Sequence, residues 1–168
     1  MDDSVRALAH RLPPEAFDEV RALGLMAIAE MNRNEGRYGA ARASAAMARP
    51  LLEQRLQERP ADTGRMRDLM RAYAYLGRCA DAEELRERVR AADREDSVSL
   101  AAASDRFYIA LRCGDSARAV AWADTLIRRG WGTPAWFGEW GTAAWFRVHA
   151  AVAPLRGRPD FERLVAGK

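Results

Sequence analysis

Apolar residues recur along the chain every three or four positions, the spacing that places them on one face of an α-helix. Clusters of glycine and proline divide this pattern into stretches of similar length. We expect an N-terminal helix within residues 1–13, helix pairs within 14–59, 62–94 and 97–130, and capping helices within 133–168. The chain is then a single all-α domain.

Two details of the predicted helices bear on their packing. In the first pair, one helix over 14–34 has an apolar face, and its partner over 38–59 contains Pro50, which either bends that helix or divides it. In the second pair, Asp81 is placed to cap a helix over 82–93. The apolar face of the first helix consists of Phe17, Val20, Leu23, Ala27 and Met31.

Composition supports helices over strands. Alanine, the best helix former, supplies 34 of the 168 residues, whereas valine, isoleucine and threonine together supply 15. No apolar run approaches the roughly 20 residues that a membrane-spanning helix needs, so we expect no membrane association.

A short pattern recurs in the three predicted pairs. Gly36, Gly77 and Gly114 are each followed, after four residues, by an alanine, and the glycines lie 41 and 37 residues apart. Tyr73 precedes Gly77 by four residues, and Leu69 precedes Tyr73 by four. Paired helices with this glycine, a preceding tyrosine and a small residue in the second helix resemble the tetratricopeptide repeat (TPR). The chain departs from that family in its longer period and in lacking the aromatic residue of the second helix.

The C-terminal residues carry a second resemblance. The segment 153–165, which reads Ala-Pro-Leu-Arg-Gly-Arg-Pro-Asp-Phe-Glu-Arg-Leu-Val, looks like the ending found after TPR regions in bacterial signalling and transcription-regulatory proteins. The resemblance implies a right-handed solenoid of about three degenerate helix pairs plus a capping helix. It also implies a regulatory or scaffold role in the bacterial cytoplasm, either as part of a larger protein or as a stand-alone relative.

TPR arrays bind peptides in a concave groove lined by the first helix of each pair. Carried over to this sequence, the groove positions are rich in arginine and tyrosine, a mixture that suits an acidic protein or peptide partner. In the alternative interpretation, Arg67 and Arg71 only pair with Asp68 or other acids on a solvated face. The predicted groove residues are Glu30, Arg33, Asn34, Arg67, Arg71, Tyr75, Tyr108 and Arg112.

An aromatic segment follows the third pair. We expect its side chains to seal the open end of the solenoid, as terminal repeats require a cap. Alternatively, Trp131, Trp136 and Trp140 stay exposed and form a surface for a homodimer or another partner.

Charge and chemistry exclude several function classes. The net charge is only +3 and both signs are interleaved along the predicted helices, so we expect no nucleic-acid partner. His10 and His149 lack ligands at metal-binding spacing, and no phosphate-binding glycine motif is present. Cys79 and Cys113 make neither a disulfide framework nor a metal site, which favours a reducing cytoplasm.

We therefore expect a non-catalytic protein or peptide interaction module without metal or cofactor. The second hypothesis is a small-ligand sensor domain of a bacterial regulator, with a pocket lined by Tyr73, Tyr75, Phe107 and Tyr108.

Overall fold

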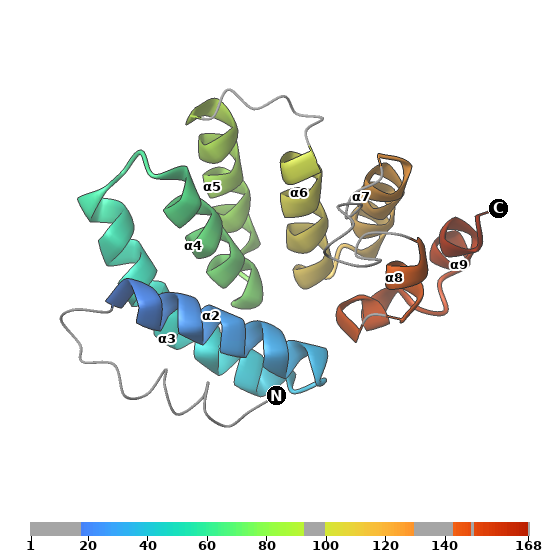
Figure 1. The fold of residues 1–168 in the computed structure, drawn as a ribbon, viewed down its shortest axis with the longest axis horizontal. Helices are drawn as coiled ribbons and strands as arrows, with labels where there is room; N and C mark the ends of the chain where they lie inside the picture. The colour runs from blue at the N-terminus through green and yellow to red at the C-terminus, as the bar shows by residue number, and fades with distance from the viewer. Residues whose placement is uncertain (1–17, 93–99, 130–142, 149, 168) are drawn as a thin grey trace. The chain divides into compact units, whose positions relative to one another are not determined.

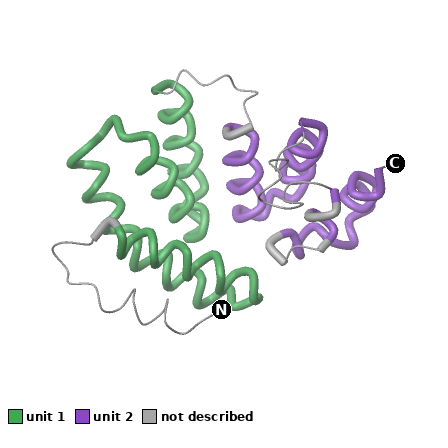
Figure 2. The backbone as a smooth tube through the Cα atoms, viewed as in Figure 1, with its two compact units in different colours: residues 1–93 green, residues 94–168 purple. Residues whose placement is uncertain are grey.

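The described residues of the computed structural model, 18–92, 100–129, 143–148 and 150–167, are helical and contain no strand (Figure 1). The chain divides into two compact units, residues 1–93 and 94–168 (Figure 2). The all-α prediction is confirmed. The N-terminal helix predicted within 1–13 lies outside the described residues, as do residues 130–142.

Unit 1 consists of two successive helix pairs. Helix α2 (Asp18–Asn34) packs along α3 (Tyr38–Glu58), α3 also packs on α4 (Thr63–Tyr75), and α4 packs along α5 (Cys79–Ala92). Unit 2 contains the pair α6 (Leu100–Arg112) and α7 (Ser116–Arg128). It continues through α8 (Ala143–Val148), the 3₁₀-helix η1 (Ala150–Leu155) and α9 (Pro159–Ala166).

A glycine makes the turn inside each of the three pairs. Gly36, Gly77 and Gly114 have φ angles of 76°, 74° and 78°, in the left-handed region that other residues enter only at a steric cost. The helix therefore stops at this point and its partner starts at once in the opposite direction. The prediction that these glycines separate paired helices is confirmed.

Small residues let the paired helices approach closely. The three alanines that follow the turn glycines, Ala41, Ala82 and Ala119, are all buried with at most 2% of their surface exposed. A larger side chain at these positions would collide with the facing helix, since protein cores are close-packed.

Helix α3 runs without a break through Pro50, which answers the question that the sequence left open. Proline removes the hydrogen bond to the carbonyl of the residue four positions earlier, here Ala46. Both Pro50 and Ala46 are exposed, so water can reach the carbonyl that loses its partner. The helix thus tolerates proline on its solvent side.

The prediction for the start of α5 is wrong. The helix begins at Cys79, directly after the Gly77 turn, because the carbonyl of Arg78 already accepts a hydrogen bond from the amide of Ala82 (3.1 Å). Asp81 consequently lies in the first turn of the helix and is not its cap. Its carboxylate instead accepts a hydrogen bond from Nε of Arg78 (2.8 Å).

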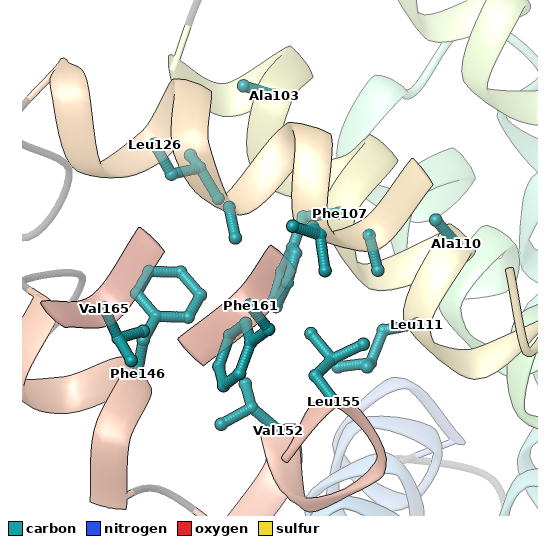
Figure 3. Packing of buried hydrophobic residues seen from close by; sticks show 13 residues of the cluster. Ala103, Phe107, Ala110, Leu111, Leu126, Phe146, Val152, Leu155, Phe161 and Val165 are labelled. Atoms are coloured by element: carbon teal, nitrogen blue, oxygen red, sulfur yellow. The ribbon is translucent and has the colours of Figure 1, made fainter. Parts of the chain in front are cut away.

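Three buried phenylalanines lie among the aliphatic residues of the core of unit 2 (Figure 3). The rings of Phe107 and Phe146 meet edge to face with centroids 5.4 Å apart and an interplanar angle of 84°. Both side chains are fully buried, and Leu155 and Phe161 of the C-terminal segment pack in the same cluster. Residues 143–165 therefore complete the core that α6 and α7 begin.

Candidate functional site

Helix α2 exposes an apolar stripe to solvent. Helix α2 packs mainly on α3, and its buried apolar side chains are Ala22, Leu25 and Ala29, all 5% exposed or less. The apolar face expected from the sequence points the other way: Val20 and Leu23 are 50% and 43% exposed, and Ala27 is exposed as well. Phe17 lies outside the described residues.

The physical reason for this reversal is the alanine-rich face of α3. A close approach to Ala41, Ala45 and Ala48 favours small residues on the opposing helix, and Ala22 and Ala29 meet that demand. Helix α2 is thus apolar on two sides, one buried and one exposed. We call the exposed side, Val20, Leu23 and Ala27, the α2 stripe.

A polar stripe on α4 joins the α2 stripe at one end. Arg67, Arg71 and Tyr75 are four residues apart and lie on one face of α4. Glu30 continues the α2 stripe by three residues, and its carboxylate accepts a hydrogen bond from the hydroxyl of Tyr75. The two helices thereby meet near their C-terminal ends and present an apolar stripe and a cationic stripe. We call this surface the α2–α4 face.

The remaining predicted groove residues of unit 1 differ in accessibility. Arg71 is the most exposed, with 45% of its side chain accessible, and it forms an ion pair with Asp68 at 3.7 Å. That pair is the one the alternative interpretation predicts. Arg33 is buried, Asn34 is half-buried, and Oδ1 of Asn34 has no hydrogen-bond partner among the described residues. Arg71 is therefore the arginine of this set that a partner reaches most easily.

The predicted groove residues of unit 2 form a stacked pair. The guanidinium of Arg112 lies 4.5 Å from the centroid of the Tyr108 ring, a cation–π arrangement within α6. The Tyr108 ring in turn meets the edge of Phe107 at 5.4 Å. Trp131, Trp136 and Trp140, proposed for a dimer or partner surface, lie outside the described residues.

Unit 1 also has a pocket that sequence analysis missed. It has a volume of about 410 Å³ and is lined by residues of α3, α4, α5 and the α3–α4 turn. Leu56, Leu69 and Leu85 are buried and form its apolar floor. Polar residues complete the lining: Glu53, Gln57, Asp81, Glu84 and Arg88.

A side-chain network closes one end of this pocket. The hydroxyl of Tyr73 donates a hydrogen bond to Glu53 (2.9 Å), and the guanidinium of Arg78 lies 4.3 Å from the centroid of the Tyr73 ring. Arg78 also forms ion pairs with Glu53 (3.7 Å) and Asp81 (2.8 Å). The network thus ties α3, α4 and α5 together.

Electrostatics in the network follow from these contacts. Burial, together with the hydrogen bond to Glu53, raises the pKa of Tyr73. The hydrogen bond from Arg78 lowers the pKa of Asp81. Both shifts favour the forms present at neutral pH, a protonated phenol and an ionised carboxylate.

The aromatic residues proposed for a small-ligand pocket come from both units. Tyr73 lines the pocket of unit 1, whereas Tyr75, two residues later, bonds to Glu30 on the α2–α4 face. Phe107 is fully buried in the core of unit 2. A helical signal for the observed pocket was present, since Glu53, Gln57 and Pro60 follow one another at intervals of four and three residues. That spacing alone does not reveal the pocket, because the lining also requires residues of α4 and α5.

Two general features of the described residues complete the site. No helix among them is long and apolar enough to cross a membrane. The described part of the chain contains no group of three or more histidine, cysteine, aspartate or glutamate residues placed to hold a metal ion.

No protein-family model, curated protein or solved structure matches the chain.

Proposed function

We propose that this chain is a non-catalytic interaction module, TPR-like in its paired helices, that docks an acidic amphipathic segment of a partner protein on the α2–α4 face. The observation that carries the proposal is the α2 stripe, which exposes Val20 and Leu23 on the side of α2 opposite its buried face. Large exposed apolar groups gathered on one side of a helix mark interaction surfaces more often than scattered ones do.

The chemistry of the face favours an acidic partner. The partner's apolar side chains would cover Val20, Leu23 and Ala27, while its carboxylates would approach Arg71 and Arg67 on α4. Arginine suits this role because its planar guanidinium binds a carboxylate through two parallel hydrogen bonds. A partner helix with one apolar face and one acidic face matches the α2 stripe and the arginines of α4.

The apolar contacts should supply most of the affinity. Complete burial of a valine or leucine side chain contributes about 1.5–3 kcal/mol. Val20 and Leu23 are already about half covered, so the partner gains roughly half of that from each. A solvent-exposed ion pair with Arg71 adds only about 0.2–1 kcal/mol and mainly sets the preference for an acidic partner.

Partner capture with matched variants tests the proposal. The full chain is immobilised and used to capture proteins from a lysate of its source organism, alongside Leu23→Ser, Arg71→Glu and Arg42→Glu. Arg42 is exposed on α3, outside the α2–α4 face, so its reversal is a control for charge alone. We expect a partner retained by the wild type and by Arg42→Glu, and bound more weakly by both Arg71→Glu and Leu23→Ser, with a loss of roughly four- to ten-fold in affinity for Leu23→Ser.

Two outcomes would contradict the proposal. A partner retained equally by all four proteins would bind elsewhere on the chain. Loss of the partner with Arg42→Glu to the same extent as with Arg71→Glu would show a general charge effect. Circular dichroism of each variant establishes that the helices are intact.

A regulatory role follows if docking changes the state of a larger assembly. The resemblance of the C-terminal segment to endings in bacterial signalling proteins supports such a role. The second hypothesis, a small-ligand sensor, is supported by a different surface, the pocket between α3, α4 and α5.

A further inference from the structure

The pocket of unit 1 is a separate binding surface. Its residues come from α3, the turn after it, α4 and α5, and none of them belongs to the predicted groove set. On α4 the pocket is lined by Leu69 and Tyr73, whereas the polar stripe of the α2–α4 face consists of Arg67, Arg71 and Tyr75. Its volume of about 410 Å³ falls in the range of sites for small ligands or single side chains.

The lining combines an apolar floor with an excess of carboxylates. Three carboxylates, those of Glu53, Asp81 and Glu84, line the pocket together with one guanidinium, that of Arg88. Leu56, Leu69 and Leu85 beneath them are at most 7% exposed. An apolar group can therefore rest on the floor while a charged group reaches the rim.

The carboxylates on the two sides of the pocket differ in their partners. Glu53 and Asp81 are bound by Arg78, whose guanidinium also covers the Tyr73 ring. Glu84, one turn further along α5, is exposed and forms no ion pair with another described residue. Glu84 is thus the carboxylate that an incoming cation can reach.

The one guanidinium in the lining does not neutralise Glu84. Arg88 follows Glu84 by four residues on α5, but its Nη2 donates to the carbonyl of Pro60 at 3.4 Å. That contact directs the Arg88 side chain toward the α3–α4 turn. An anionic ligand would have to approach three carboxylates to reach it.

We propose that this pocket binds a cationic group carried on a short apolar stem, the chemistry of an arginine side chain or an alkylguanidinium. The stem lies on the leucine floor and the cation pairs with Glu84. The fold already holds one guanidinium in this way, since Arg78 lies over Tyr73 between two carboxylates at the end of the same pocket. The pocket therefore prefers a cationic ligand, whereas the α2–α4 face prefers an acidic partner.

A titration with three small probes of similar size tests this site. Butylguanidinium, pentan-1-ol and pentanoate are added separately to the full chain labelled at its leucine methyl groups, and NMR shifts are followed at Leu56, Leu69 and Leu85. All three probes share the apolar stem and differ in the charge of the head. We expect the three leucines to respond most strongly to butylguanidinium, with pentan-1-ol weaker and pentanoate weakest.

The charge of Glu84 sets the size of the preference. An exposed ion pair worth about 0.2–1 kcal/mol corresponds to an affinity ratio of up to roughly five-fold between butylguanidinium and pentan-1-ol. Glu84→Gln should abolish that ratio without changing the affinity for pentan-1-ol. Glu58→Gln is the matched control, because Glu58 is exposed on α3 outside the pocket lining and should leave the ratio unchanged.

Three results would overturn the proposal. If none of the probes shifts the leucine methyl groups, the pocket does not bind this class of ligand. Binding of pentanoate as tight as that of butylguanidinium would refute the charge preference while keeping an apolar site. A preference that survives in Glu84→Gln would place the cation elsewhere. The comparison of probes on the wild type is decisive even if a variant folds poorly.

Discussion

Replacing Phe146 with alanine should destabilise unit 2 severely. The Phe146 side chain is fully buried, and its ring meets that of Phe107 edge to face. Truncation of a buried phenylalanine to alanine costs about 3–5 kcal/mol, which includes the lost burial and the cavity left behind. This loss is large compared with the 5–15 kcal/mol by which a typical domain is stable.

A second substitution at the same position separates ring geometry from volume. Phe146→Leu keeps most of the apolar volume and loses the aromatic pair with Phe107, an interaction worth about 0.5–1.5 kcal/mol. We therefore expect Phe146→Leu to cost roughly 1–1.5 kcal/mol, well below the cost of the alanine variant.

The distribution of tryptophan provides the assay. All five tryptophans of the chain lie within unit 2, so tryptophan fluorescence follows that unit during urea denaturation, while circular dichroism follows the helices of both units. For a unit of this size, with a denaturant dependence of about 1 kcal/mol per molar urea, a loss of 3 kcal/mol lowers the midpoint by roughly 3 M. A fluorescence midpoint lowered by less than 1 M in the alanine variant would show that Phe146 is not part of the core.

Two further predictions concern unit 1. Gly77→Ala should destabilise the chain by about 1–2 kcal/mol, because Gly77 has a φ of 74°. Gly39→Ala should stabilise it by up to about 1 kcal/mol, because Gly39 lies within helix α3 and no atom lies close to where the new methyl group would sit. Thermal unfolding followed by circular dichroism measures both changes, and changes of the same sign would contradict the prediction. Tyr73→Phe should cost about 0.5–1.5 kcal/mol at pH 7 by removing the hydrogen bond to Glu53. Because burial and the hydrogen bond to Glu53 raise the pKa of Tyr73 in the folded protein, this stabilisation is fully present below the unfolded value near 10 and is lost as the pH rises above it through the folded value. The urea midpoints of wild type and variant should therefore stay apart up to about pH 10 and converge at higher pH, and a constant difference would refute the link to ionisation.

The turns and the small residues could be predicted from the sequence because each rests on local chemistry. Gly36, Gly77 and Gly114 mark positions where the chain must adopt a left-handed conformation, and no other residue does so cheaply. The alanines five positions later are buried, as the resemblance to paired helices implied. Capping helices were expected within 133–168, and the structure places Phe146 of that range in the core of unit 2.

The orientation of α2 could not be predicted from its own sequence. Both Val20 with Leu23 and Ala22 with Leu25 give an apolar stripe at helical spacing, and hydrophobic periodicity alone does not choose between them. The choice depends on α3, whose alanine face accepts the stripe with the smaller residues. Tertiary packing thus decided which apolar face became buried and which stayed exposed.

The pocket could not be predicted because it depends on three helices at once. Glu53 and Glu84 are 31 positions apart in sequence and line the same pocket only when α3 and α5 both pack near α4. Taken alone, each of these glutamates has the sequence surroundings of an ordinary solvent-exposed helix residue.

Mapping where an acidic amphipathic segment binds shows whether the α2–α4 face is its docking surface. The probe is a synthetic 18-residue helix with leucine along one edge and glutamate along the other, added to the full chain during amide and methyl NMR. A second probe with lysine in place of each glutamate is the control. We expect shifts at Val20, Leu23, Ala27 and Arg71 with the acidic probe, and weaker shifts with the basic one. Shifts that avoid these residues, or that are equal for both probes, would contradict the proposed docking.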